Sequence, residues 1–368
     1  MGPARWRDGN ASRVCSFRLS RRPSRMPPKN ATIQDVATLS GVSIGTVSAV
    51  INRKGTVSND TRRRVLEAIS ELHYRPSAAA RRRLQPTTEK SIGLIVKETN
   101  NPYFADVISG AQDAARGLGY NVLVAHTDRS YELEQKLAEL LVAMDVDGLI
   151  INPLLNDQTD LSHLFEIRRS NVPLVLIESI RGIQASMVDV DNVAAEKEAI
   201  EYLAGLGHER IAHFAGPQYS THSDERIEGV RRAFVSKRLV MAEDDVVHAG
   251  ANLEDGYRAA LAYFRDRADR PTAVTCYNDL LAIGAVRALR ELGRDVPGDV
   301  SVVGFDDIDV ASYLTVPLTT VRMPRRQIGR RATEMLIRTL EEDEAAAPEK
   351  VVLETELVVR DSTAPPSA

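Results

Sequence analysis

The chain has few of the residues that build disulfides and metal centres, and it lacks the usual phosphate-binding motifs. Its 368 residues include two cysteines, Cys15 and Cys276, and seven histidines without ligand spacing. This composition excludes a disulfide framework and a thiolate metal site. No glycine-rich phosphate loop and no GxSxG nucleophile elbow follows any expected strand. We therefore expect neither an enzyme nor a bound cofactor or metal.

Long hydrophobic runs are also missing. No apolar run approaches the roughly 18 residues that a membrane-spanning helix needs, so we expect no membrane partner and a cytoplasmic, nucleoid-associated protein. Residues 1–29 are rich in Arg, Ser and Pro and have no apolar core of a secretory signal. They allow three interpretations: a disordered basic arm that contacts phosphates, a transit-like peptide, or an unused upstream start. We favour a start at Met26, with disorder in either case.

Charge is distributed unevenly along the chain. The net charge is -4, but residues 1–90 hold 18 Lys and Arg against 6 Asp and Glu, while the remaining residues hold 29 against 45. A basic front end on an acidic body indicates a nucleic-acid-binding module attached to a body that does not bind nucleic acid.

Residues 30–76 show the pattern of three short helices. Thr32 and Asp35 have capping-box spacing, Gly41 allows a sharp turn, and Ser43 and Ser58 are N-cap candidates for the next two helices. The predicted inward-facing residues are Ile33, Val36, Ala37 and Leu39, then Val47, Val50 and Ile51, then Val65, Leu66, Ile69 and Leu72. A small bundle without a ligand would share this pattern. The small and polar start of the second helix and the flanking arginines favour a helix-turn-helix that binds DNA.

From Ser91 onward, apolar runs alternate with helical periods, which predicts parallel sheets covered by helices on both faces. The expected strands are Ile92–Val96, Val122–Ala125, Gly148–Ile151 and Leu174–Ile177, then 210–215, 245–248, 273–276 and 300–304; the expected helices lie near 103–118, 131–143 and 159–169, then 193–206, 224–238, 254–267 and 279–292. Two such series indicate two doubly wound subdomains, and ligands of such sheets bind beyond the carboxyl ends of the strands.

Several separate segments resemble a known family. ATIQDVATLSGVSIGTVSAVIN and VSNDTRRRVLEAISELHYRPSAAAR closely resemble the headpiece of the lac repressor (LacI/GalR) family of bacterial regulators, and the resemblance continues through NNPYFADVISGAQDAA, GHERIAHFAGP, PTAVTCYNDLLAIGAVRAL and DVSVVGFDDIDVASYLTVPLTTVRMP. It covers roughly residues 30–361. The implied fold is an all-α helix-turn-helix headpiece plus an α/β body of two doubly wound parallel-sheet subdomains, similar to type I periplasmic binding proteins.

The resemblance also implies a domain plan. Residues 30–76 form the DNA-binding domain, 77–90 the hinge, and 91–361 the effector-binding and dimerisation body, before a disordered tail at 362–368. One lobe comprises about 91–189 plus 322–344, and the other about 190–321 plus 350–361. The helix from Pro324 to Leu340 is expected to return to the first lobe, and the strand Val351–Val359 to join the second.

On the DNA side, Ile44, Gly45 and Ala49 take the base-reading positions. Many family members carry polar side chains at the first two positions and Arg or His at the third, so this chain lacks bidentate guanine readout from them. Apolar contact of Ile44 with a thymine methyl stays open, and the hinge and DNA shape are expected to contribute to specificity. Leu84 is the expected hinge wedge in the minor groove, although the segment is one residue longer than usual. The full set of expected DNA contacts is Thr32, Ser43, Ile44, Gly45, Thr46, Ala49, Asn52, Thr56, Ser58, Thr61, Arg81 and Leu84.

On the effector side, the resemblance implies an arginine, Arg226, and an aspartate, Asp306, that bind a polar ligand unless they close into an ion pair with each other. Of Tyr103 and Phe104, one is expected to stack on a ring and the other to belong to the core. The full set of expected effector contacts is Asn101, Tyr103, Phe104, Glu178, Ser220, His222, Arg226, Asn278 and Asp306.

The sequence thus indicates a homodimeric repressor that binds a pseudo-palindromic double-stranded operator under control of a small polar effector, with a sugar or sugar derivative preferred. A purine- or nucleoside-responsive regulator and one dependent on a protein co-repressor remain alternatives. A solute-binding protein of a transporter is a remote one, because it needs a secretory signal.

Overall fold

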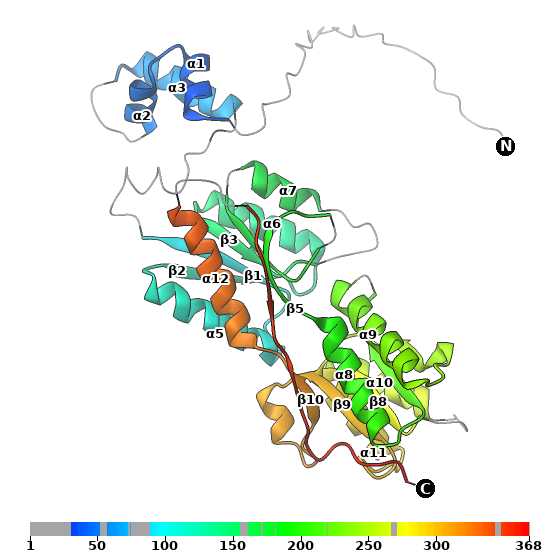
Figure 1. Cartoon of the computed structure of the whole chain (residues 1–368). Coiled ribbons are helices and arrows are strands. Elements are labelled where there is room, and N and C mark those ends of the chain that lie inside the picture. Colours follow the sequence, from blue (N-terminus) through cyan, green and yellow to red (C-terminus); the bar gives the residue numbers. More distant parts are fainter. Residues whose placement is uncertain are drawn as a thin grey trace, which may run out of the picture.

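The structure is a computed structural model that describes residues 31–51, 57–72, 74, 89–154, 161–170, 172–180, 182–218, 220–265, 271–342 and 347–367. It comprises a three-helix headpiece and an α/β body of two lobes, each built on one six-stranded sheet (Figure 1). The expected fold class is confirmed. No single helix in these ranges is long and apolar enough to span a membrane. The helices Ile33–Ser40 and Ile44–Ile51 reach that length and apolar composition only when taken together, and they are bent by 103° relative to each other.

The headpiece has a small apolar core. Its helices are α1 (Ile33–Ser40), α2 (Ile44–Ile51) and α3 (Asn59–Glu71). Val47 and Val50 of α2 are buried against Val36 of α1 and Val65 of α3. Leu39 and Leu66 were assigned to this core from sequence, but they are 46% and 52% exposed. That assignment was wrong because one face from each of the three helices already fills so small an interior.

Local capping sets the limits of these helices. The hydroxyl of Thr32 accepts a hydrogen bond from the backbone N–H of Asp35, whose carboxylate accepts one from the backbone N–H of Thr32. Gly41 then ends α1 in the left-handed region at φ 67°, where a residue with a Cβ would be strained. Ser58 caps α3 by accepting from Thr61 N. The predicted capping box and turn are confirmed.

Lobe 1 is organised around the parallel sheet β11-β5-β4-β3-β1-β2. Its elements are β1 (Ser91–Val96), α5 (Pro102–Gly117), β2 (Asn121–His126), α6 (Tyr131–Ala143), β3 (Gly148–Ile151), α7 (Ser162–Arg169), β4 (Leu174–Ile177), β5 (Ser186–Val190), α12 (Arg325–Glu341) and β11 (Lys350–Leu353). Helices α5 and α12 pack together on one face, and residues of α6 and α7 form a separate apolar cluster on the other. The strands β3 and β4 are buried along their whole length, as central parallel strands should be.

Lobe 2 is organised around the sheet β12-β10-β9-β8-β6-β7, which is parallel except for the β10–β12 pair. Its elements are α8 (Asn192–Gly205), β6 (Ile211–Ala215), α9 (Thr221–Lys237), η1 (Glu243–Asp245), β7 (Val246–His248), α10 (Leu253–Phe264), β8 (Ala273–Cys276), α11 (Asp279–Glu291), β9 (Ser301–Asp306), η2 (Asp309–Ser312), β10 (Thr319–Arg322) and β12 (Glu356–Val358). Helices α8 and α9 pack together, and so do α10 and α11.

The chain crosses between the lobes three times: after β5, after β10 and after β11. The red C-terminal segment in Figure 1 runs along both lobes. Helix α12 returns to lobe 1 as predicted, and it approaches α5 so closely that a Cβ on Gly329 would lie 1.9 Å from the carbonyl oxygen of Val107. Only glycine allows that contact.

Three expectations for the body were wrong. The strands β5 and β10 are missing from the predicted set, although both are sheet members. The strand predicted over Val351–Val359 is two strands, of which β11 pairs with β5 in lobe 1 and only β12 joins lobe 2. The tail is ordered through residue 367: Ser362 is fully buried, and its hydroxyl donates to the carbonyl of Val302 at 2.6 Å.

Candidate functional site

A cavity of about 100 Å³ lies between the two lobes, next to the carboxyl ends of strands from both sheets. This is where ligands of doubly wound folds bind. It is lined by Lys97, Glu98, Asn101, Tyr103, Phe104, Arg129, Asn152, Pro153, Leu154, Glu178, Pro217, Gln218, Ser220, Thr221, His222, Arg226, Tyr277, Asn278, Asp306 and Met323. Every expected effector residue therefore lines this one cavity.

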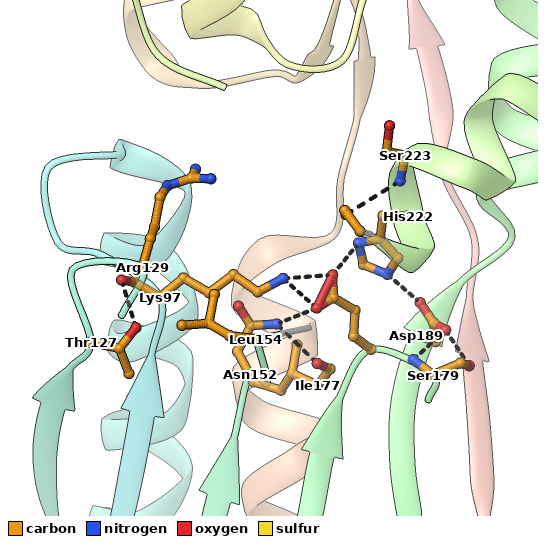
Figure 2. A network of polar contacts seen from close by, with 12 residues as sticks. Lys97, Thr127, Arg129, Asn152, Leu154, Ile177, Ser179, Asp189, His222 and Ser223 are labelled. Carbon is orange, nitrogen blue, oxygen red and sulfur yellow. Dashed lines mark hydrogen bonds and ion pairs between the residues drawn. The ribbon is translucent and has the colours of Figure 1, made fainter. Parts of the chain in front are cut away.

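The lobe 1 wall is charged but internally paired. Lys97, which directly follows β1, donates to both carboxylate oxygens of Glu178, which follows β4. Asn152, which follows β3, donates to Glu178 Oε2 at 3.2 Å and to the carbonyl of Ile177 at 2.9 Å (Figure 2). With its amide nitrogen held in this way, the buried Asn152 Oδ1 has no hydrogen-bond partner among the described residues.

His222, near the start of α9 in lobe 2, inserts between two carboxylates of lobe 1. Its Nδ1 lies 2.8 Å from Glu178 Oε1, and its Nε2 lies 3.1 Å from Asp189 Oδ1; Figure 2 shows the ring facing Asp189. Burial alone would lower the pKa of His222, but the two carboxylates outweigh it and raise the pKa to about 10. The histidine is therefore a cation at neutral pH, and it ties the two lobes together.

We call Glu178, His222 and Asp189 the clamp. Both of its carboxylates are held in their ionised form. Burial alone would raise the pKa of Glu178, but His222 and Lys97 lower it to about 2. Asp189, on β5, also accepts from the backbone N–H and the hydroxyl of Ser179, and its pKa lies below the usual value despite burial. Glu178 was expected to accept hydrogen bonds from effector hydroxyls. That role is curtailed, because Lys97, His222 and Asn152 already occupy its oxygens.

Two residues of the clamp, Asp189 and His222, form with Glu225 the one group of described residues that could hold a metal ion. Asp189, His222 and Glu225 offer ligand atoms that lie within 4.8 Å of one another. A histidine can bind a metal only as a neutral imidazole with a free lone pair. Both ring nitrogens of His222 face carboxylates, an arrangement suited to an ion network.

Arg226, one turn further along α9, is buried with its guanidinium in the cavity wall. It donates from Nε to Asn192 Oδ1 at 3.1 Å and from Nη1 to the carbonyl of Tyr277. Its guanidinium also lies over the rings of Phe305 and Tyr277, at 3.5 and 4.6 Å from their centroids. Among the described residues, no carboxylate forms an ion pair with it. The expected alternative of a closed pair with Asp306 is therefore not what the structure contains.

Asp306 ends β9 and enters the cavity through an unusual backbone conformation, with φ at 118°. Within the described part of the chain, no hydrogen bond to its carboxylate is found, although the residue is 6% exposed. Burial raises the pKa of this carboxyl to about 7, while Arg226, Arg325 and His222 oppose the rise. The neighbouring Asp307 instead pairs with Arg322 and Arg360.

Three expected effector residues serve as helix caps. The side-chain oxygens of Asn101, Ser220 and Asn278 accept from the first turns of α5, α9 and α11 respectively. Asn278 also donates to the carbonyl of Ala251. Asn278 was expected to contact the effector, and in this structure its oxygen and one amide hydrogen are already engaged within the protein. Capping needs only local backbone groups, and it competes with ligand binding for the same atoms.

The two aromatic residues differ in burial. Phe104 is 6% exposed and belongs to the large apolar core, whereas Tyr103 is only partly buried and meets Phe104 edge to face with ring centroids 5.0 Å apart. Both rings line the cavity, and Tyr103 is the more exposed of the two.

Sequence analysis missed several lining residues, including Lys97, Arg129, Asn152 and Tyr277. Arg129 forms a bidentate pair with Glu98, at 3.1 and 2.6 Å. The available signal was position: these residues directly follow β1, β2, β3 and β8 or lie in the loop beyond them. Because the ends of parallel strands converge, residues at such positions are site candidates for the same reason as Glu178, which also follows a strand.

The DNA-binding expectations concern the headpiece. Ile44 and Gly45 are exposed at the start of α2, Ala49 is half-buried, and Ser43, Thr46, Thr32, Ser58 and Thr61 lie at or next to helix N-termini. Hydroxyls and N–H groups at such positions are suited to phosphate contacts. Asn52, Thr56, Arg81 and Leu84 lie outside the described residues, as do residues 1–29 and most of the hinge.

Comparison with known proteins agrees with these observations. Residues 32–77 match the family described as bacterial regulatory proteins, lacI family, and residues 200–363 match a periplasmic binding protein-like domain. An HTH-type transcriptional repressor PurR of Photobacterium profundum is 34% identical over 335 residues, which cover 90% of this chain and 98% of that protein.

Two solved structures are similar over nearly the whole chain. A transcriptional regulator CelR–cellobiose complex is 34% identical with a TM-score of 0.69, and the match covers 90% of this chain and all of that one. A lac repressor dimer bound to operator and the anti-inducer ONPF is 28% identical with a TM-score of 0.67, and the match covers 91% of this chain and all of that one.

Proposed function

Because this chain belongs to the lacI family of bacterial regulatory proteins and is a DNA-binding transcriptional repressor, we propose that a small, polar, sugar-like effector in the cleft controls its affinity for DNA. The protein acts as a homodimer on a pseudo-palindromic operator, since two headpieces related by a two-fold axis read two half-sites.

The observation that carries this proposal is that Arg226 and Asp306 both line the cavity and do not form an ion pair with each other. The buried guanidinium of Arg226 retains N–H donors, and the buried carboxylate of Asp306 has acceptors. No ion pair joins the two groups in the described residues. A buried charge without a partner is costly. A ligand with neighbouring hydroxyls can accept from the guanidinium and donate to the carboxylate, and so relieve both costs.

The other polar groups of the cavity support a neutral ligand. The cations Lys97 and Arg129 and the anions Glu98 and Glu178 are already paired with one another. At these four groups a charged ligand gains an ion pair only by breaking an existing one, whereas a polyol only adds hydrogen bonds. Tyr103 provides a ring against which the apolar face of a sugar can stack. The cellobiose complex of the similar regulator CelR supports the same ligand class.

Effector control follows from the position of the cleft between the lobes. A ligand that binds one lobe arrangement better than the other shifts the equilibrium between them, and a few kcal/mol of differential affinity is sufficient. The arrangement of the two lobes in each subunit then sets the placement of the two hinges and headpieces on the operator.

The proposal is tested by titrating the full-length protein with cellobiose, other mono- and disaccharides, nucleosides and purine bases in an isothermal calorimeter. A sugar that binds and changes operator affinity in a fluorescence anisotropy assay is the expected result. Tight binding of a purine base with no heat from any sugar would overturn the sugar assignment. Binding of no small molecule, with operator affinity changed by a protein partner, would overturn effector control itself.

A matched pair of variants tests the site. Asp306→Asn removes the unpaired carboxylate charge and is expected to weaken effector binding about tenfold or more, as expected for a charge-assisted hydrogen bond. Asp307→Asn, at the next position but paired with Arg322 and Arg360, is expected to leave effector affinity unchanged. Equal losses in both variants would show that the effect is structural and not a ligand contact.

A further inference from the structure

Helix α2 has an unusual composition for a helix that reads DNA. Its eight residues, IGTVSAVI, include no charged residue, no asparagine and no glutamine. The inner face is formed by Val47 and Val50, which are 0% and 3% exposed. On the outer face the helix begins with Ile44, whose side chain is 43% exposed (α2 in Figure 1).

The hydrogen-bonding side chains of α2 are limited to two hydroxyls. That of Thr46 lies 2.9 Å from the hydroxyl of Ser43, the residue that precedes the helix; the other hydroxyl belongs to Ser48. Bidentate recognition of guanine needs Arg or Lys, and bidentate recognition of adenine needs Asn or Gln. Helix α2 therefore cannot read either purine in this way.

One feature of the major groove remains readable by an apolar side chain. The C5 methyl group of a pyrimidine is the apolar group on the base edges, and it distinguishes thymine from unmodified cytosine. The backbone beside Ile44 is unobstructed, because a Cβ on Gly45 would meet only the hydroxyl of Ser43, at 3.7 Å. The start of α2 can thus approach the base edges closely.

We propose that Ile44 is a specificity-determining residue that reads the C5 methyl group of one pyrimidine in each operator half-site. This inference rests on the DNA-binding function given above. In unmodified DNA the base is thymine. The recognised group is the methyl and not the O4 of thymine, so 5-methylcytosine at the same position satisfies Ile44 as well.

The expected magnitude follows from burial of one methyl group. Burying a methylene or methyl is worth a factor of about four in affinity, and two symmetric half-sites give a factor of about fifteen for the dimer. A hydrogen-bonded base contact would exceed this factor, and a solvent-exposed side chain would give none.

The test uses the full-length protein and an operator selected from a random duplex library. Each thymine pair that is symmetric about the centre is replaced by deoxyuridine, which removes the methyl group and retains base pairing, and affinity is measured by fluorescence anisotropy. We expect one symmetric pair whose replacement lowers affinity about fifteenfold. The same measurement with Ile44→Ala should show weaker binding to the thymine operator and no further loss on deoxyuridine.

Two further arms separate the methyl from the rest of the base. At the sensitive pair, a cytosine–guanine pair is compared with its 5-methylcytosine form, and methylation should strengthen binding by the wild type and not by Ile44→Ala. Leu66→Ala is the control variant, because it removes a similarly exposed apolar side chain, 52% exposed, from α3. It should retain the full deoxyuridine effect.

The outcomes are distinguishable. If the operator is bound but no thymine is sensitive to loss of its methyl, or if Ile44→Ala retains the sensitivity, the inference is overturned while the DNA-binding function stands. If the selection yields no bound sequence, the failure lies with the function on which the inference rests. Circular dichroism of Ile44→Ala confirms that the headpiece remains folded, as expected for an exposed position.

Discussion

Replacing His222 with glutamine should remove a pH-dependent contribution to stability that no surface histidine supplies. The ring is clamped between Glu178 and Asp189, at 2.8 and 3.1 Å, and its pKa is raised from 6.5 to about 10. A group whose pKa is higher in the folded state stabilises the fold by binding a proton. Its contribution is fully present below the unfolded value of 6.5 and is lost as the pH rises through about 10.

The size of the effect can be worked out for neutral pH. Between the unfolded and folded values, each pH unit changes the contribution by about 1.4 kcal/mol, so at pH 7 it amounts to at most about 4 kcal/mol in the free energy of unfolding. The carboxylate partners do not interfere in this window. The pKa of Glu178 is lowered, so its contribution is present above its usual value of 4.5 and is lost only as the pH falls through about 2.

The assay is urea denaturation of wild type and His222→Gln, followed by far-ultraviolet circular dichroism between about pH 7 and about pH 10. The difference in free energy of unfolding should shrink steadily across this range. The control is His126→Gln, because the His126 side chain at the end of β2 is 44% exposed and pairs with the exposed Asp128, so this variant should follow the wild type. A difference for His222→Gln that stays constant with pH would refute a charged clamp.

Three further outcomes are expected. Because burial raises the pKa of Asp306 to about 7, an effector that donates hydrogen bonds to its carboxylate should bind more tightly above that pH than below it, and calorimetry of Asp306→Asn should show no such dependence. Deleting residues 362–368 should destabilise the protein by about 2 kcal/mol or more in urea denaturation, since it leaves buried groups of β9 and β10 without hydrogen-bond partners. Gly329→Ala should cost about 1–3 kcal/mol, because the new Cβ would lie 1.9 Å from a carbonyl oxygen of α5, whereas Gly117→Ala, with nothing within 4 Å, should not destabilise.

Local signals were the reliable part of the sequence analysis. Thr32, Asp35 and Ser58 act within one turn of themselves, so their capping roles are legible from spacing alone. The alternation of apolar runs and helical periods likewise located most strands and helices within one to three residues. Both kinds of signal depend on neighbours along the chain, which the sequence displays directly.

Features that depend on residues far away along the chain could not be predicted from the sequence. The stretch after residue 349 reads as one strand, but β11 pairs with β5 and β12 with β10, and nothing near it in sequence reveals where the chain leaves one sheet for the other. The tail from Ser362 reads as disordered because it is short and polar. Its order comes from hydrogen bonds to Val302 and Thr319, which lie far away along the chain.

The sequence by itself determined the two-part plan of this protein, a basic helix-turn-helix followed by a doubly wound body, because that plan follows from period, capping and charge. The expected effector residues came from the resemblance to a known family, and the structure brings all of them to one cavity. Only the tertiary structure decided which of these groups retain free hydrogen-bonding capacity. The negative charge of Glu178 is compensated by His222 and Lys97, and the oxygen of Asn278 is used in a helix cap. Asp306, in contrast, keeps an unpaired carboxylate. The physical reason is that a buried charge is governed by the groups that folding brings within a few ångströms of it.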